Sequence, residues 1–202
     1  MRDRFVELLM STKREGMDKL VEWMDQNGFF EAPCSGGNHL AKEGGLVEHS
    51  LNVLDIMESS YYKGGKLVES AFIPPESIVI CALLHDLGKA GDFGKPAYIE
   101  NWVKDGRPTK AEPEQRYKRS ETKPFIGNAK LMYVPHEVRS IVIAERFINL
   151  TEEEQHAIYY HNGKYTHTGY DLKETPLQML LHFADLWASR VVEKENEETQ
   201  PE

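Results

Sequence analysis

Apolar residues recur along most of the chain at the three- and four-residue spacing of an α-helix. The helices that this spacing predicts cover residues 2–27, a segment that follows Gly44-Gly45, and residues 134–148, 152–161 and 175–193. Thr151 and Glu154 have the spacing of a capping box at one of these helix starts. Pro74-Pro75-Glu76 predicts the start of a further helix, because proline is favoured in the first turn.

That further helix should be the central one. Its residues from Ile78 to Leu84 are apolar on every side, which is typical of a helix buried within a domain, and we expect it to end at Gly88. With helical patterns before and after it, the chain is predicted to be all-α.

Residues 91–131 break the helical pattern. Four prolines interrupt this stretch, and Asp105-Gly106 separates two short segments, Tyr98–Lys104 and Gln115–Arg119, that could pair as a hairpin. Connections of about 40 residues are uncommon in compact domains and are often functional. We therefore expect a long loop or a small β-hairpin insertion at about 91–131 that covers the functional site.

The composition is that of an ordinary globular protein, with 40% hydrophobic and 28% charged residues. No apolar run is long enough for a membrane span, and the first residues lack a secretory signal. The two cysteines, Cys34 and Cys81, suggest a reducing compartment, and neither has the spacing of a thiolate metal site. We therefore expect a cytoplasmic protein without membrane partners. The net charge of −9 argues against stable binding to duplex DNA. The segment from Lys104 to Lys130, however, contains eight Lys or Arg and only four Asp or Glu. This local excess of positive charge suggests an anionic substrate.

Five predicted helices carry a metal-capable side chain on the face expected to point inward. These side chains are His49, the pair His85-Asp86, His136, His161 and Asp185. Each histidine alone could be an ordinary hydrogen-bonded core residue. Together they favour one shared site around divalent cations, because buried imidazolium and carboxylate groups are costly without partners.

The residues around these positions resemble a known family. The matching stretches are GGLVEHS (44–50), LLHDLGK (83–89) and ADLWAS (184–189), with single histidines at 136 and 161. They resemble the HD superfamily of metal-dependent phosphohydrolases in its six-ligand H…HD…H…H…D form, and are similar to HD-type exoribonucleases and HD phosphodiesterases. The resemblance implies a helical HD domain at 36–192, which leaves a helical extension at 1–35 and an acidic flexible tail at 193–202.

By position, the resemblance implies two divalent metal ions. The ligands of the first ion would be His49, His85, Asp86 and Asp185. Asp86, which we expect to be catalytic, would bridge to a second ion held by His136 and His161. Imidazole and carboxylate ligands suit Mn, Fe, Ni or Zn, with Mg possible. Lys89 would be catalytic too, by contacting the phosphate or stabilising the transition state, although it could instead cap the helix end.

Further residues are candidates for substrate contacts: His39, Arg116, Lys118, Arg119, Asn162 and Lys164. His39 lies in a stretch similar to the family's N-terminal flank of the site, but could equally be a surface histidine. The basic residues of the insertion could contact phosphate, although a solvated charged loop is the plainer interpretation of each. Asn162 and Lys164 follow His161 closely.

The leading functional expectation is hydrolysis of a phosphoester, in a phosphorylated small molecule such as a nucleotide or in a short oligonucleotide, by a metal-activated water. Two alternatives stay open. The diiron oxygenases of the HD fold use nearly the same ligands and can also carry a lysine after the HD pair. A non-catalytic module would retain the fold in order to bind a nucleotide. Fold alone does not choose among substrates.

Overall fold

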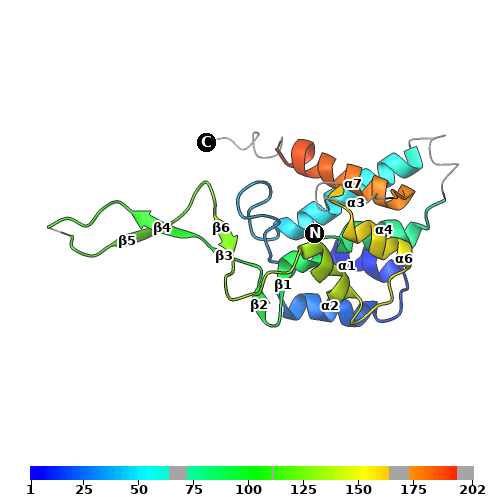
Figure 1. The fold of residues 1–202 in the computed structure, drawn as a ribbon, viewed down its shortest axis with the longest axis horizontal. Helices are drawn as coiled ribbons and strands as arrows, with labels where there is room; N and C mark the ends of the chain where they lie inside the picture. Colours follow the sequence, from blue (N-terminus) through cyan, green and yellow to red (C-terminus); the bar gives the residue numbers. More distant parts are fainter. Residues whose placement is uncertain (64–71, 111, 164–172, 195–202) are drawn as a thin grey trace.

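The computed structural model describes residues 1–63, 72–110, 112–163 and 173–194 and shows a predominantly helical protein (Figure 1). Its α-helices are α1 (Arg2–Ser11), α2 (Met17–Gln26), α3 (Gly45–Lys63), α4 (Pro75–Leu84), α5 (His136–Ala144), α6 (Glu152–Tyr159) and α7 (Pro176–Trp187). A 3-10 helix, η2 (Leu87–Ala90), follows α4, and a π-helix, η4 (Ala188–Val192), continues α7. None of the helices that the structure describes is long and apolar enough to cross a membrane.

The prediction of a central apolar helix is confirmed. Every residue of α4 from Ser77 to Leu84 is buried, and α4 packs against α1, α3, α6 and α7. Burial of each large aliphatic side chain there, such as Ile80 or Leu83, contributes about 1.5–3 kcal/mol. The regular helix ends earlier than expected, at Leu84, and the chain continues through His85 and Asp86 into η2.

The predicted helical stretch over residues 2–27 is divided into two helices, although its end near Asn27 is as expected. Gly16 separates them with a φ of 84°, a conformation that residues with a Cβ rarely adopt. A Cβ at Gly16 would also lie 1.9 Å from the carbonyl oxygen of Phe147. Phe5 and Leu9 of α1 are fully buried in the same core as α4.

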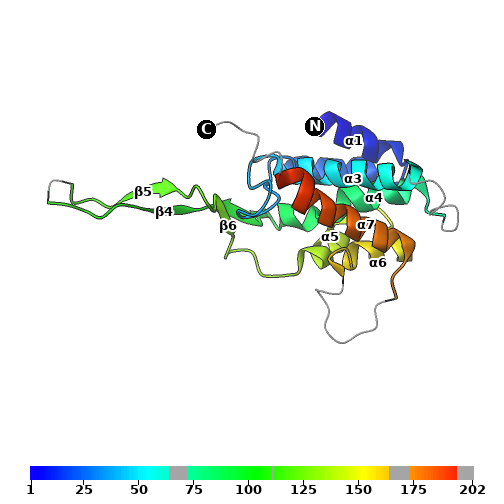
Figure 2. The ribbon, with the colours of Figure 1, turned by 90° about the horizontal axis from the view of Figure 1, so that it is seen from above.

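The insertion contains more strands than the single β-hairpin that the sequence predicts. Three two-stranded antiparallel sheets pair β1 (Gly91–Asp92) with β2 (Lys95–Pro96), β3 (Tyr98–Glu100) with β6 (Phe125–Gly127), and β4 (Trp102–Asp105) with β5 (Arg116–Arg119). The predicted hairpin is confirmed for β4 and β5. Figures 1 and 2 show these two strands, which we call the arm, projecting away from the helices.

The prediction was wrong for Tyr98 to Glu100, which pair with β6 instead of the strand near Gln115. The cause lies at Asn101, whose carbonyl accepts from Ser120 N at 2.8 Å and whose N–H donates to Pro124 O at 2.9 Å. Residues 121–123 therefore loop out opposite Asn101, and the pairing partner changes on either side of it. Asp105 is paired with Arg116, so the turn of the arm is also longer than Asp105-Gly106.

Helix packing brings the candidate site residues toward one region. α3 and α7 pack against each other, and α5 packs against η2, directly after His85 and Asp86. This last contact requires Gly88, because a Cβ there would lie 2.4 Å from the carbonyl oxygen of His136. The Gly88 N–H donates to Ser140 Oγ at 2.8 Å, which fixes α5 against η2.

Candidate metal centre

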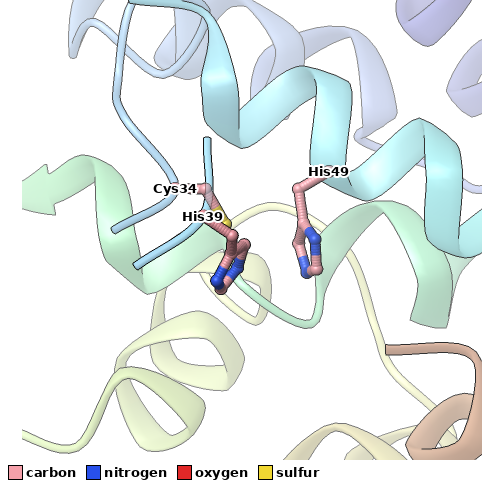
Figure 3. A group of neighbouring side chains, drawn as sticks. All are labelled: Cys34, His39 and His49. Atoms are coloured by element: carbon pink, nitrogen blue, oxygen red, sulfur yellow. The ribbon is translucent and has the colours of Figure 1, made fainter. Parts of the chain in front are cut away.

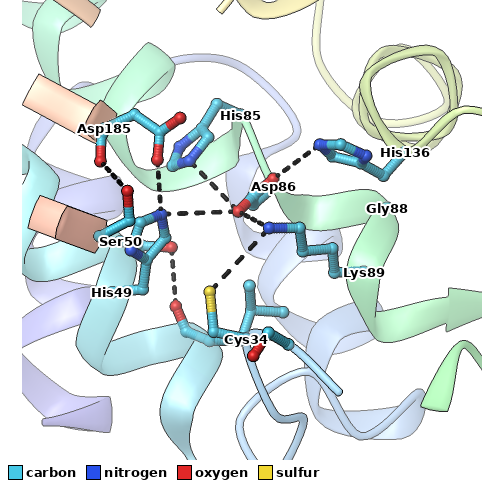
Figure 4. Close-up of polar contacts among 12 residues, drawn as sticks. Cys34, His49, Ser50, His85, Asp86, Gly88, Lys89, His136 and Asp185 are labelled. Carbon is cyan, nitrogen blue, oxygen red and sulfur yellow. Dashed lines mark hydrogen bonds and ion pairs between the residues drawn. The ribbon is translucent and has the colours of Figure 1, made fainter. Parts of the chain in front are cut away.

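The carboxylate of Asp86 is surrounded by four histidine rings. Its Oδ2 lies 3.6 Å from His49 Nε2 and 3.4 Å from His85 Nε2. Its Oδ1 lies 3.2 Å from His136 Nε2 and 3.7 Å from His161 Nε2. Figure 4 shows His49, His85 and His136 on different sides of this carboxylate. Asp86 is thus a buried centre with one pair of histidines at each oxygen.

Asp185 completes the set of six predicted ligands. Its Oδ1 lies 3.1 Å from His49 Nε2, on the Oδ2 side of Asp86. The ligand atoms of His49, His85 and Asp185 lie within 4.8 Å of one another, and so do those of His85, Asp86 and His161. These buried groups could hold metal ions. The six residues that the sequence predicts as ligands come from five separate segments, and the structure brings them together.

Three of the histidines have Nδ1 beside a hydrogen-bond acceptor, which fixes the orientation of the ring. Nδ1 of His85 lies 2.9 Å from the carbonyl oxygen of Ala82, and Nδ1 of His161 lies 2.7 Å from that of Ile158. A carbonyl oxygen only accepts, so each Nδ1 carries a proton, and the orientation of the ring directs each Nε2 toward Asp86. Nδ1 of His49 lies 2.8 Å from Oε1 of a carboxylate, that of Glu193.

Several buried polar atoms at this centre make no hydrogen bond of good geometry with the residues that the structure describes. They include His49 Nε2, His85 Nε2 and Asp86 Oδ1. Buried polar groups are almost always hydrogen-bonded, so a cluster of exceptions needs a physical reason. Imidazole nitrogens and carboxylate oxygens form a donor set that suits divalent Mn, Fe, Ni or Zn. The residues present therefore fit a metal ion.

Lys89 forms an ion pair within this centre. Its Nζ donates to Asp86 Oδ2 at 2.6 Å, so it neutralises this carboxylate instead of only capping the helix end. Burial alone would raise the pKa of Asp86, but Lys89 and the histidines hold that pKa well below its usual range. Burial opposes the charge of Lys89 as well, yet Asp86 raises the pKa of its ammonium group. Both groups are charged at neutral pH.

The remaining ligands differ in charge. Burial lowers the pKa of His161 to about 4, so its ring is neutral near pH 7, as a metal ligand must be. Burial would raise the pKa of Asp185, but the close contact with His49 and the charge of that ring hold it well below its usual range. The centre thus offers two carboxylates and at least one neutral imidazole.

Glu193 is the residue that sequence reasoning missed, because it opens the acidic segment expected to form a tail. Its side chain is fully buried, and Oε1 accepts from His49 Nδ1 at 2.8 Å and Asn52 Nδ2 at 3.2 Å. The wider turn of η4 rotates Glu193 back toward the face of the helix that carries Asp185. The four-residue spacing of Asp185, Ser189 and Glu193 is the signal that could have revealed it. Residues 195–202 of the expected tail lie outside the described residues.

Glu137 was also missed. It is 3% exposed, and its Oε2 lies 3.4 Å from His136 Nδ1. Its Oε1 accepts from Asn162 Nδ2 at 2.7 Å, and this Nδ2 also lies 3.2 Å from His161 Nε2. Asn162 therefore lies beside the site, and its contact with substrate stays a prediction, whereas Lys164 lies outside the described residues.

His39 lies next to the site on the side of His49 (Figure 3). Its Nε2 is 3.3 Å from Cys34 Sγ and 3.7 Å from Glu193 Oε2, and its ring centroid is 5.3 Å from that of His49. Burial lowers the pKa of His39. His39 is thus a half-buried neighbour of the candidate ligands, and a contact with substrate stays a prediction.

The basic residues of the insertion are not brought to the candidate ligands. Arg116 and Lys118 lie on the arm and form surface ion pairs with Glu112 and Glu121, each at 3.2 Å. Arg119 lies 3.5 Å from Glu100, and its guanidinium is 4.6 Å from the ring centroid of Phe125. Figure 2 shows the arm projecting from the helical body, and the contacts of these three residues are all with residues of the insertion.

Comparison of the chain with family profiles, curated proteins and solved structures gave no match. The fold and the site themselves define the class of protein: it is predominantly helical and contains a buried cluster of histidine and aspartate residues able to hold metal ions.

Proposed function

We propose that this protein is a metal-dependent phosphohydrolase of the HD type, which cleaves a phosphoester of a nucleotide or short oligonucleotide with a metal-activated water. One observation carries the proposal: four histidine Nε2 atoms and the ammonium of Lys89 converge on the buried carboxylate of Asp86. The order of these residues along the chain is also that of the six-ligand HD pattern.

The two oxygens of Asp86 support the assignment of two ion sites. His49, His85 and Asp185 would hold one ion beside Oδ2, and His136 with His161 would hold the other beside Oδ1. Bound divalent ions would supply Lewis acidity to a phosphoryl oxygen and lower the pKa of a water. The carbonyls of Ala82 and Ile158 hold two of the imidazole rings in the required orientation.

Lys89 would bind the phosphoryl group. Its ammonium lies at the edge of the centre on a flexible stem, with the side chain 17% exposed. A fixed cation there stabilises the negative charge that develops on the phosphoryl oxygens in the transition state. A flexible stem lets the ammonium move from Asp86 to a substrate oxygen.

A covalent mechanism through the nearby cysteine is disfavoured. Cys34 Sγ lies 4.0 Å from Lys89 Nζ, but the residue is fully buried. Burial raises the pKa of this thiol to about 11, so it stays protonated and a poor nucleophile. Attack by water needs no side-chain nucleophile, in agreement with the donor set around Asp86.

The test uses the full chain, stripped of metal with a chelator and reloaded separately with Mn²⁺, Fe²⁺, Ni²⁺, Zn²⁺ or Mg²⁺. We expect phosphate or nucleoside release from a panel of nucleotides and short oligonucleotides with at least one metal, and its loss in Asp86→Ala. The exposed Asp18→Ala variant is the matched control and should keep full activity.

Three results would overturn the proposal. Turnover that does not depend on metal would show that the candidate metal ligands have no role in the reaction. Dioxygen uptake by the iron-loaded protein without phosphoester cleavage would favour an HD-fold diiron oxygenase. Tight binding of a nucleotide that is left intact with every metal would favour a non-catalytic binding module.

A further inference from the structure

A cleft of about 410 Å³ opens directly beside the candidate metal centre. One wall contains Lys89 and His136, which belong to that centre. The other wall comes from the base of the insertion, with Tyr98, and from the segment that follows the insertion, with Met132 and Tyr133. Its volume is in the range of small-molecule sites. A molecule held in this cleft would therefore reach both the candidate ligands and the insertion.

The cleft is cationic although the chain carries a net charge of −9. Lys89 and Arg139 line it, and no acidic residue is among the described residues that do so. Arg139 is already engaged, because its Nη2 donates to the carbonyl oxygen of Met132 at 2.8 Å and its Nη1 lies 3.9 Å from Asp92 Oδ2. Arg139 thus fixes the backbone before Tyr133. Lys89 is paired with Asp86 at 2.6 Å, but its flexible stem lets the ammonium turn from that carboxylate to an anionic ligand.

The second wall of the cleft carries aromatic side chains with exposed surface. Tyr98 is paired with Gly127 across the β3–β6 ladder, and residues paired in this way point to the same face. A Cβ at Gly127 would meet none of the described residues within 4 Å, so these residues leave the space next to Tyr98 on that face open. Tyr133 is 90% exposed and Met132 is 86% exposed. Exposed aromatic and thioether side chains beside a polar site provide flat, apolar contact surface for a ring system.

We propose that this cleft receives the planar base of a nucleotide, stacked against Tyr133 and bordered by Tyr98, while its phosphate lies at Lys89 and the candidate metal ligands. This inference rests on the proposed function and specifies where the base of its substrate binds. Base stacking on aromatic side chains tolerates every base, so the cleft would favour nucleotides over sugar phosphates without reading sequence. The base of the insertion would thus determine specificity, and the projecting arm would take no part in it.

The experiment compares adenosine 5′-phosphate with ribose 5-phosphate, which carries the same phosphate and sugar without the base. Binding of each to the metal-loaded full chain is measured by titration calorimetry, and turnover is measured separately. We expect the wild-type protein to bind adenosine 5′-phosphate about tenfold or more tightly than ribose 5-phosphate. Tyr133→Ala should abolish most of this preference and leave the affinity for ribose 5-phosphate unchanged.

Two further variants sharpen the test. Gly127→Leu fills the free space beside Tyr98 and should weaken binding of adenosine 5′-phosphate at unchanged metal content. Tyr117→Ala removes a tyrosine of the arm that is 57% exposed, and it should change neither affinity. Equal affinities of the wild-type protein for the two ligands, or a preference retained in both Tyr133→Ala and Gly127→Leu, would overturn the base cleft.

The outcomes for cleft and chemistry are separable. Phosphate release without any preference for the base contradicts the cleft and leaves the proposed hydrolase standing. A base-dependent preference that Tyr133→Ala removes supports the cleft even if no metal gives turnover, in which case only the proposed hydrolase fails.

Discussion

His49 Nδ1 lies 2.8 Å from Glu193 Oε1, a contact between residues that are 144 positions apart in the chain. The carboxylate holds the ring so that Nε2 lies 3.1 Å from Asp185 Oδ1. Burial would raise the pKa of Glu193, but the hydrogen bond and charge of His49 hold it below its usual value. A charged partner of this kind fixes the tautomer of a metal-binding histidine and increases its basicity.

Glu193→Gln should therefore weaken metal binding, although Glu193 is not itself among the proposed ligands. Loss of such a partner typically lowers metal affinity by about 10–100-fold. Competition with a chromophoric chelator measures the affinity. Glu7→Gln, an exposed glutamate of α1, is the matched control. An affinity for metal equal to that of the wild-type protein would show that Glu193 only packs against His49.

The two oxygens of Asp86 predict different metal contents for two variants. Asp86→Ala removes the shared carboxylate, so we expect it to lose most of its metal and all activity. His136→Ala removes one ligand on the Oδ1 side, 3.2 Å from that oxygen, so it should keep the first ion and lose the second. Elemental analysis after gel filtration counts the ions per chain. The same metal content in both variants would contradict two sites joined by Asp86.

Lys89→Ala separates metal binding from chemistry. The ammonium is not a ligand, so the variant should retain its metal. We expect kcat to fall by about 10²–10³-fold, the usual loss when one charge-stabilising donor is removed from a transition state. Lys89→Arg should recover part of the rate, since it keeps the positive charge. If metal content falls along with kcat, Lys89 acts by neutralising Asp86 and not on the substrate.

Most of the helical scaffold and all six proposed ligands could be predicted from local patterns. The apolar run before His85 and the spacing around His49 and Asp185 specify which helix faces point inward. The burial of Glu193 was harder to predict, because the four-residue spacing from Asp185 through Ser189 is only a weak signal and the π turn of η4 is not indicated by local composition. The pairing of Tyr98 with Gly127 depends on the residues that loop out opposite Asn101, a property of backbone hydrogen bonds and not of side-chain pattern.

The buried ion pair between Arg14 and Glu154 makes a prediction about stability. Glu154 is fully buried and accepts from Arg14 Nη2 at 2.8 Å, from Ser77 Oγ at 2.8 Å and from the N–H of Thr151 at 2.8 Å. The predicted capping box of α6 is thereby confirmed, and its glutamate also ties the segment before α2 to α6. Glu154→Gln leaves Arg14 without its charged partner and should destabilise the fold by roughly 3 kcal/mol.

The same pair predicts the pH dependence of that loss. Burial would raise the pKa of Glu154, but Arg14, the Thr151 N–H and Ser77 hold it below its usual value. A lowered folded-state pKa means that the stabilisation is complete above the unfolded-state pKa of about 4.3 and disappears as the pH falls through the folded-state value. Urea unfolding at pH 7 should therefore separate Glu154→Gln from the wild-type protein, and the difference should shrink below about pH 4. Glu153→Gln, the exposed neighbour, should match the wild-type protein throughout. A loss in Glu154→Gln that is equal at pH 7 and pH 3 would mean that the capping hydrogen bonds, and not the charge of Glu154, stabilise this junction.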